Sequence, residues 1–186
     1  MNRILGLYNN LTDLLVCTAG DSLPTLARLV FVGVLSGYFW SSAMTKLDGL
    51  FTPSVGAYAQ IFPRVFEAAG YNPGNLGLWH RVVVLAGSYA EFVLPFLILV
   101  GLATRLAAIG MAGFIVVQSL TDIFGHGADV STIGKWFDPV PDALILDQRA
   151  LWMMILAVLV FLGAGRFSAD HYLRKQVITW AKSAAS

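Results

Sequence analysis

A single acidic residue, Glu91, stands inside the apolar stretch LAGSYAEFVLPFLILVGLATRLAA, which covers residues 85–108. The nearest preceding charge, Arg81, lies ten residues away. An ionised carboxylate that faces lipid costs roughly 3 kcal/mol or more, so Glu91 is expected to face the protein interior, either protonated or paired. A buried carboxylic acid can take up and release a proton near neutral pH. Glu91 is therefore the first candidate for a catalytic residue.

Two polar residues on other apolar stretches fall near the expected depth of Glu91. At 1.5 Å of rise per residue, Glu91 lies roughly 15 Å from the end of its span, and Ser36 and Gln118 lie at about the same depth. Two interpretations remain open. In the first, these side chains form a polar pocket around a proton-handling acid. In the second, Glu91 only hydrogen-bonds Gln118 or Ser36 and holds the helices together.

The basic residues at the ends of the apolar stretches also have two interpretations. Arg105 begins one stretch and is expected to extend to the lipid headgroups. Arg28 lies about one turn deeper in its own stretch. It either extends to the headgroups as well or points inward as a second catalytic candidate. Lys46, at the opposite end of the stretch that holds Arg28, is interpreted as an interfacial anchor rather than as part of a site.

Two histidines are the weak candidates for a metal site. His80 precedes the stretch that holds Glu91, and His126 lies one turn after Asp122 at the end of the next stretch. Paired histidines on adjacent helices can bind haem or a metal ion. Because no metal-binding spacing accompanies them, no metal site is predicted, and haem and copper stay open only as weak alternatives.

The composition identifies the class of protein that must position these residues. Of the 186 residues, 57% are hydrophobic and 12% are charged, whereas soluble domains carry about 25% charged residues. The mean hydropathy is +0.71. Long apolar stretches that alternate with short polar ones predict an integral membrane protein. A net charge of +1 without a basic patch excludes a nucleic-acid partner, and the lone Cys17 provides no thiol pair to carry electrons.

Four stretches are long enough to cross a bilayer, which needs about 20 apolar residues. They are expected at residues 24–45, 82–102, 105–124 and 146–165, with Pro24 in the first helical turn. The fold class is thus an all-α, integral membrane four-helix bundle in a single domain of residues 1–186. Gly101 and Thr104 are expected to end one helix and cap the next.

The segments outside the spans have their own predicted structure. Residues 4–16 form an interfacial segment, residues 46–79 contain an amphipathic surface segment kinked at Pro63, and residues 166–186 form an amphipathic cytoplasmic tail whose helix is capped by Ser168. Seven of the twelve Lys and Arg residues lie on the side of the two termini and five in the two long loops. This bias predicts that both termini are cytoplasmic.

Three segments of the chain resemble the DoxX family of small bacterial membrane proteins. They are LARLVFVGVLSGYFWSSAMTKL, AEFVLPFLILVGLATRLAAIGMAG and RALWMMILAVLVFLGAGRFSAD. The resemblance implies a four-helix bundle in the bacterial inner membrane, with a protein partner in a redox or metal-stress pathway. Proteins of the family that the chain resembles include the membrane subunit of thiosulfate:quinone oxidoreductase, and a membrane partner of superoxide dismutase and a sulfurtransferase. Glu91, Arg28 and Arg105 match recurrent polar positions of that family.

Three functions follow from these observations. The leading one is a membrane subunit of a redox system that passes electrons to quinone, with Glu91 and Arg28 as catalytic residues and Ser36, Gln118 and Arg105 as quinone-binding residues. The alternative is a non-enzymatic scaffold in the bilayer that docks soluble redox or metal-handling partners through its outer loops. A copper-handling component that uses Met44 and the two histidines ranks third. A homo-oligomer is compatible with each.

Overall fold

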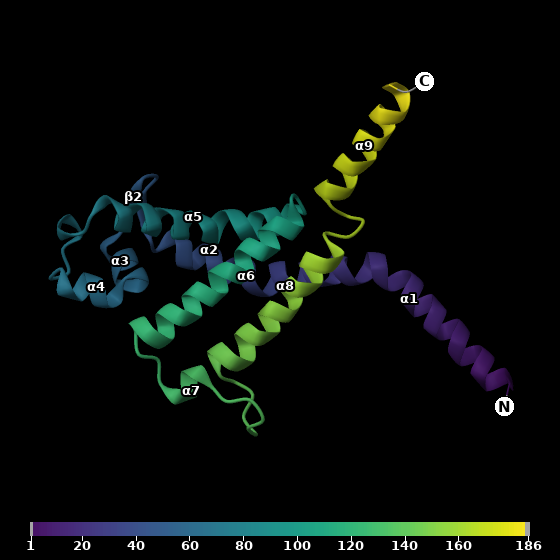
Figure 1. The fold of residues 1–186 in the computed structure, drawn as a ribbon, viewed down its shortest axis with the longest axis horizontal. Helices are drawn as coiled ribbons and strands as arrows, with labels where there is room; N and C mark the ends of the chain where they lie inside the picture. Colours follow the sequence, from purple (N-terminus) through teal and green to yellow (C-terminus); the bar gives the residue numbers. More distant parts are fainter. Residues whose placement is uncertain (1, 185–186) are drawn as a thin grey trace.

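The computed structural model describes residues 2–184 and confirms an all-α membrane bundle (Figure 1). Four helical stretches in this part of the chain are long and apolar enough to cross a membrane: Arg3–Met44, Leu78–Val100, Thr104–Gly125 and Leu144–Leu162. The three later stretches lie within a few residues of their predicted bounds. The last one begins at Leu144, since the apolar residues ahead of Asp147 join the helix.

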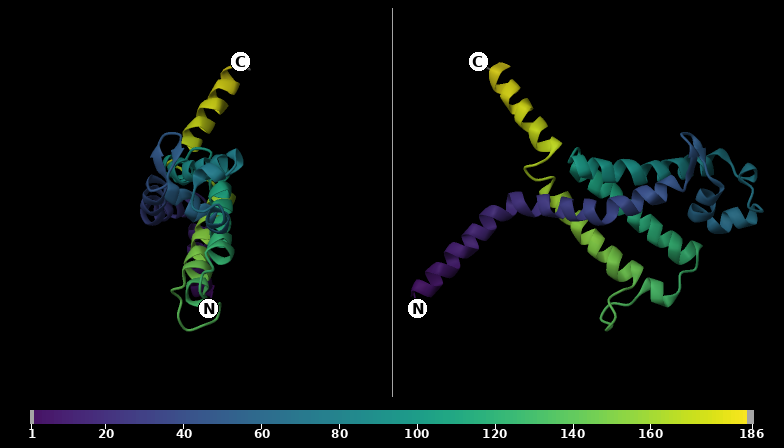
Figure 2. Two further views of the ribbon diagram at one scale, coloured as in Figure 1. Left: turned by 90° about the vertical axis from the view of Figure 1, so that its left-hand side faces the viewer. Right: turned by 180° about the vertical axis from the view of Figure 1, so that it is seen from behind.

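The first stretch is one continuous helix, built from α1 (Asn2–Phe31), the π-helical segment η1 (Val32–Ser36) and α2 (Gly37–Met44). The prediction that this helix begins at Pro24 is wrong, because Pro24 lies inside α1. A proline there removes one backbone hydrogen bond, but the residues on both sides are compatible with helix. At 1.5 Å per residue the 42 residues extend for about 63 Å, twice the thickness of a hydrocarbon layer. Accordingly, the start of α1 projects away from the other helices (Figures 1 and 2).

The core lies where four helical stretches meet. α1 packs on α8 (Ala150–Leu162), α8 on α6 (Thr104–Leu120), α6 on α5 (Leu78–Val100), and α5 on α2. The fully buried side chains between them are aromatic and aliphatic, and include Phe31, Phe39, Ile98, Met111 and Leu156. The π-helical segment η3 (Thr121–Gly125) extends α6, and a second one, η4 (Leu144–Arg149), leads into α8.

The turn between α5 and α6 is tight. Gly101 ends α5 in the left-handed conformation, at φ 71°, and Leu102 N–H donates to the carbonyl of Leu97. The predicted cap by Thr104 is wrong. The carboxylate of Asp170 accepts from the N–H groups of Ala103 and Thr104, at 2.7 and 2.9 Å, and so caps α6 from another part of the chain.

The connection between α2 and α5 folds back against α5. It contains a hairpin of β1 (Leu47–Gly49) and β2 (Thr52–Pro53), followed by α3 (Val55–Ile61), α4 (Pro63–Ala68) and the 3₁₀ turn η2 (Pro73–Asn75). The predicted break at Pro63 is found, since α3 and α4 meet there. Ala57, Tyr58 and Phe66 of this segment form a second buried cluster with Val84 of α5.

Two further helices complete the described chain. Asp129 caps α7 (Val130–Ile133) by accepting from Thr132 N–H at 2.7 Å, and this backbone bond, with Ser131 Oγ donating beside it, lowers the pKa of Asp129. α9 (Ala169–Ala184) projects away from the bundle (Figure 1). The predicted cap of this tail helix is present, because Ser168 Oγ accepts from His171 N–H. Residues 185–186 of the predicted tail lie outside the described residues.

Candidate functional site

Glu91 forms a buried ion pair with Lys46. Lys46 Nζ lies 2.5 Å from Glu91 Oε1 and donates a second hydrogen bond to Ser42 Oγ at 2.7 Å. The two charged side chains are 6% and 3% exposed. The interpretation of Lys46 as an interfacial anchor is therefore wrong: α2 packs against α5, which turns the lysine at its end toward the acid. Opposite charge and hydrogen bonding offset part of the desolvation cost of the two groups.

A pocket of about 530 Å³ lies beside this ion pair. Its walls come from α2, α3, α5 and α6. Of these, α5 and α6 diverge from their common turn (Figure 1). Apolar and small residues form most of the lining, and the absent side chains of Gly87, Gly110 and Gly113 leave room between the helices. Oε2 of Glu91 is buried and has no hydrogen-bond partner among the described residues. Glu91 therefore lines the pocket with one carboxylate oxygen that no described residue uses.

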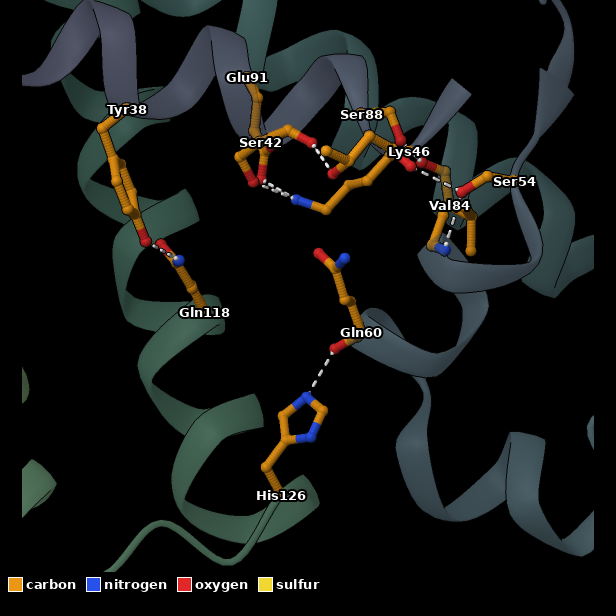
Figure 3. A network of polar contacts seen from close by, with 12 residues as sticks. Tyr38, Ser42, Lys46, Ser54, Gln60, Val84, Ser88, Glu91, Gln118 and His126 are labelled. Atoms are coloured by element: carbon orange, nitrogen blue, oxygen red, sulfur yellow. Dashed lines mark hydrogen bonds and ion pairs between the residues drawn. The ribbon is translucent and has the colours of Figure 1, made fainter. Parts of the chain in front are cut away.

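The wall opposite Glu91 carries a second polar pair. Gln118 Nε2 on α6 donates to the hydroxyl of Tyr38 at 3.0 Å, and Oε1 of Gln118 has no partner within residues 2–184. Toward the loops, His126 Nε2 lies 3.0 Å from the carbonyl oxygen of Gln60. Figure 3 shows these groups arranged around one space, with Lys46 and Glu91 on one side and Gln118, Gln60 and His126 on the other.

A second, partly buried ion pair holds one wall of the pocket in place. Arg149 of η4 donates to Asp122 Oδ2 at 2.7 Å and to Ser119 Oγ at 3.0 Å. The Arg149 side chain is 3% exposed, whereas Asp122, which also lines the pocket, is 29% exposed. Because α8 follows η4 directly, this pair ties the loop end of α6 to the fourth span.

The structure brings some of the predicted site residues together and separates others. Glu91 and Gln118 line the same pocket. Ser36 is buried in η1, and its hydroxyl has no hydrogen-bond partner among the described residues, but it is not part of the pocket wall. Arg28 and Arg105 lie at the other end of the bundle.

Arg28 binds the loop between α8 and α9. Its guanidinium donates to the carbonyl oxygens of Ala164, at 2.9 Å, and Phe167. Both carbonyl groups lie beyond Leu162, the last residue of α8, so the guanidinium joins α1 to the loop that follows the fourth span. Arg105 lines a different cavity, near Gly163. Neither arginine is therefore close to Glu91.

The two histidine candidates are also apart. The His80 ring packs edge-on against Phe62, with 5.0 Å between the ring centroids, whereas His126 faces the pocket. Among the described residues, no group of three or more His, Cys, Asp or Glu side chains is placed to hold a metal ion.

Sequence reasoning missed four of the polar residues at this site: Tyr38, Ser42, Lys46 and Gln60. One local signal was available, since Ser42 and Lys46 are one helical turn apart and so share a face. Nothing local pointed to Gln60, because α3 reaches the pocket only through the fold of the loop.

Comparison with known proteins identifies the family. A model of the DoxX family matches residues 23–127, which is more than half of the chain and includes every residue of the pocket lining. No curated protein and no solved structure matches the chain. The match is carried by three of the four spans and the loop segment between α2 and α5. The chain is therefore a membrane protein of the DoxX family.

Proposed function

We propose that the pocket between α2, α3, α5 and α6 binds a quinone, and that the protein is the membrane subunit of a redox system that reduces it. The observation that carries this proposal is the buried Lys46–Glu91 pair on the wall of a largely apolar cavity of about 530 Å³, with Oε2 of Glu91 unpartnered among the described residues. An apolar pocket with a few convergent polar groups is typical of a small-molecule site.

The polar groups of the pocket fit both redox forms of a quinone. The oxidised form has carbonyl oxygens, which only accept hydrogen bonds. Lys46 has three N–H donors, of which two are used by Glu91 and Ser42, and the Tyr38 hydroxyl accepts from Gln118 while its own hydrogen is free to donate. The reduced form has hydroxyl groups, and Glu91 Oε2 can accept from one of them.

Glu91 is the proposed proton-handling residue. Bound quinone supplies a two-electron acceptor that takes up two protons on reduction. Oε2 of Glu91 can hold such a proton while Lys46 keeps its hydrogen bond to Oε1. Since the chain has a single cysteine, the two electrons come from a partner redox protein or a reduced substrate.

The proposed location is the bacterial inner membrane, with both termini in the cytoplasm. The excess of Lys and Arg on the side of the termini supports this orientation. It places the tight turn between α5 and α6 inside and the loop segment that holds Gln60 and His126 outside.

The quinone proposal is tested by measuring bound quinone in purified protein. Wild type extracted in mild detergent is expected to retain quinone, detected by solvent extraction and mass spectrometry, and Glu91→Gln is expected to lose most of it. Glu67→Gln is the matched control, since Glu67 is exposed on α4. A folded Glu91→Gln protein that retains quinone and reduces it at the wild-type rate would contradict the proposal.

A scaffold that docks a soluble partner is the second candidate. The observation that favours it is a pair of aromatic side chains in the loop before η4, where Trp136 is 60% exposed and Phe137 is fully exposed. Phe137→Ser tests this candidate. Loss of cellular function in Phe137→Ser together with normal function in Glu91→Gln would select the scaffold over the quinone site.

A further inference from the structure

A second cavity, of about 490 Å³, lies at the opposite end of the bundle from Glu91. It is bordered by the turn between α5 and α6, the end of α8 and the start of α9, with Gly20 and Asp21 of α1 on one side. These segments converge in Figure 1 and in the right-hand view of Figure 2. The backbone bond from Asp170 N–H to Gly101 O, at 2.8 Å, holds the start of α9 against the turn.

The charged groups around this cavity leave two arginines available. Arg105 and Arg174 line it, and neither guanidinium has a hydrogen bond or ion pair to another described residue. A side chain at position 163 would place its Cβ atom 3.4 Å from Arg105 Nε, so Gly163 keeps that face of the guanidinium open.

The two acids of the lining are already engaged. Asp170 accepts from two N–H groups at the amino end of α6, and Asp21 pairs with Arg166 at 3.1 Å. Arg28 is buried beside the same turn. Four arginines therefore surround two acids here, and the excess positive charge is that of Arg105 and Arg174.

Thr104 adds an uncharged group to the same wall. It is fully buried, and its hydroxyl has no hydrogen-bond partner within the described chain. A hydroxyl left without a partner at the border of a cavity is satisfied by a polar ligand or by water. The lining thus contains two free guanidinium groups and an unused hydroxyl.

We propose that this cavity binds a phosphate group between Arg105 and Arg174. The planar guanidinium group matches phosphate oxygens with paired N–H donors. The phosphate is carried either by the headgroup of an anionic lipid or by a soluble phosphate ion. Position favours the lipid, because Arg105 lies in the first turn of a membrane span, at the depth where arginines reach headgroups.

The test uses the full-length protein in mild detergent and native mass spectrometry. Phosphatidylglycerol is compared with a diacylglycerol of the same acyl chains, which lacks the phosphate, and inorganic phosphate is titrated separately by ³¹P NMR. The double variant R105Q/R174Q is expected to bind phosphatidylglycerol about 30-fold more weakly than wild type. R64Q/K135Q is the matched control, because it removes two exposed cations from the loops at the other end.

Each outcome either tests the proposal or identifies the molecule that carries the phosphate group. Phosphatidylglycerol binding that depends on the two arginines, without binding of inorganic phosphate, supports the lipid headgroup. Inorganic phosphate binding with the same dependence supports a soluble ion. Equal binding of the two lipids by wild type with no phosphate binding would overturn the proposal, as would equal losses in the two double variants.

Discussion

The Lys46–Glu91 pair makes the sharpest prediction about stability. Both side chains are almost fully buried and lie 2.5 Å apart, so removal of either partner leaves the other charge buried. Stranding a charge in this way costs about 3 to 5 kcal/mol of unfolding free energy. Lys46→Met and Glu91→Leu are each expected to show that loss.

The double variant is expected to recover most of the loss. Replacing a buried ion pair by apolar residues of similar volume is often neutral or stabilising, so Lys46→Met/Glu91→Leu should lie within about 1 kcal/mol of wild type. At about 2 to 4 °C per kcal/mol for a chain of this size, each single variant lowers the Tm by about 6 to 20 °C. The Tm is measured for the purified protein in one detergent. A double variant that loses the sum of the two single effects would refute the pairing.

Three further predictions concern the elements around the two cavities. Arg149→Met is expected to lower the unfolding free energy by about 2 to 4 kcal/mol, which is less than the loss for Lys46→Met because Asp122 is 29% exposed. In the same thermal assay, Arg149→Met/Asp122→Leu should recover part of that lost free energy. Gly101→Ala should lower the Tm, because residue 101 has φ 71° and the added Cβ would collide with the Arg28 guanidinium and Ser168. Gly33→Ala is the control: its added Cβ would meet no described atom within 4 Å, so the Tm should stay unchanged or rise. The hydrogen bonds to Asp129 lower its pKa, so the α7 cap should be fully formed above the ordinary Asp pKa of about 3.9 and be lost as the pH falls through the lower pKa of the folded state. Hydrogen exchange of the Thr132 amide checks this, and it should become faster only below about pH 3.9.

The spans were predictable from sequence because length and apolarity are local properties of the chain. The Gly101 end of α5 was predictable for the same reason, since a glycine after an apolar run signals a left-handed cap. The error at Pro24 shows the limit of a local signal. Proline begins many helices, but one missing hydrogen bond does not prevent a helix from continuing through it.

The polar contacts were less predictable because they join distant parts of the chain. The burial of Glu91 followed from the lipid cost of a carboxylate, but its partner did not. Lys46 stands at the end of a span, where most lysines reach the headgroups, and only the packing of α2 on α5 turns it inward. Asp170 caps α6 from 66 residues away rather than serving only its own helix.

The central claim, that the pocket beside Glu91 binds quinone, is tested most directly by photo-crosslinking. A quinone with a photoreactive group is irradiated with the membrane-embedded protein, and the labelled peptides are mapped by mass spectrometry. Labelling is expected on the segments of Tyr38, Glu91 and Gln118, with suppression by excess unmodified quinone and loss in Glu91→Gln. Labelling spread over the lipid-facing surfaces, unchanged by competition and by the substitution, would contradict the claim.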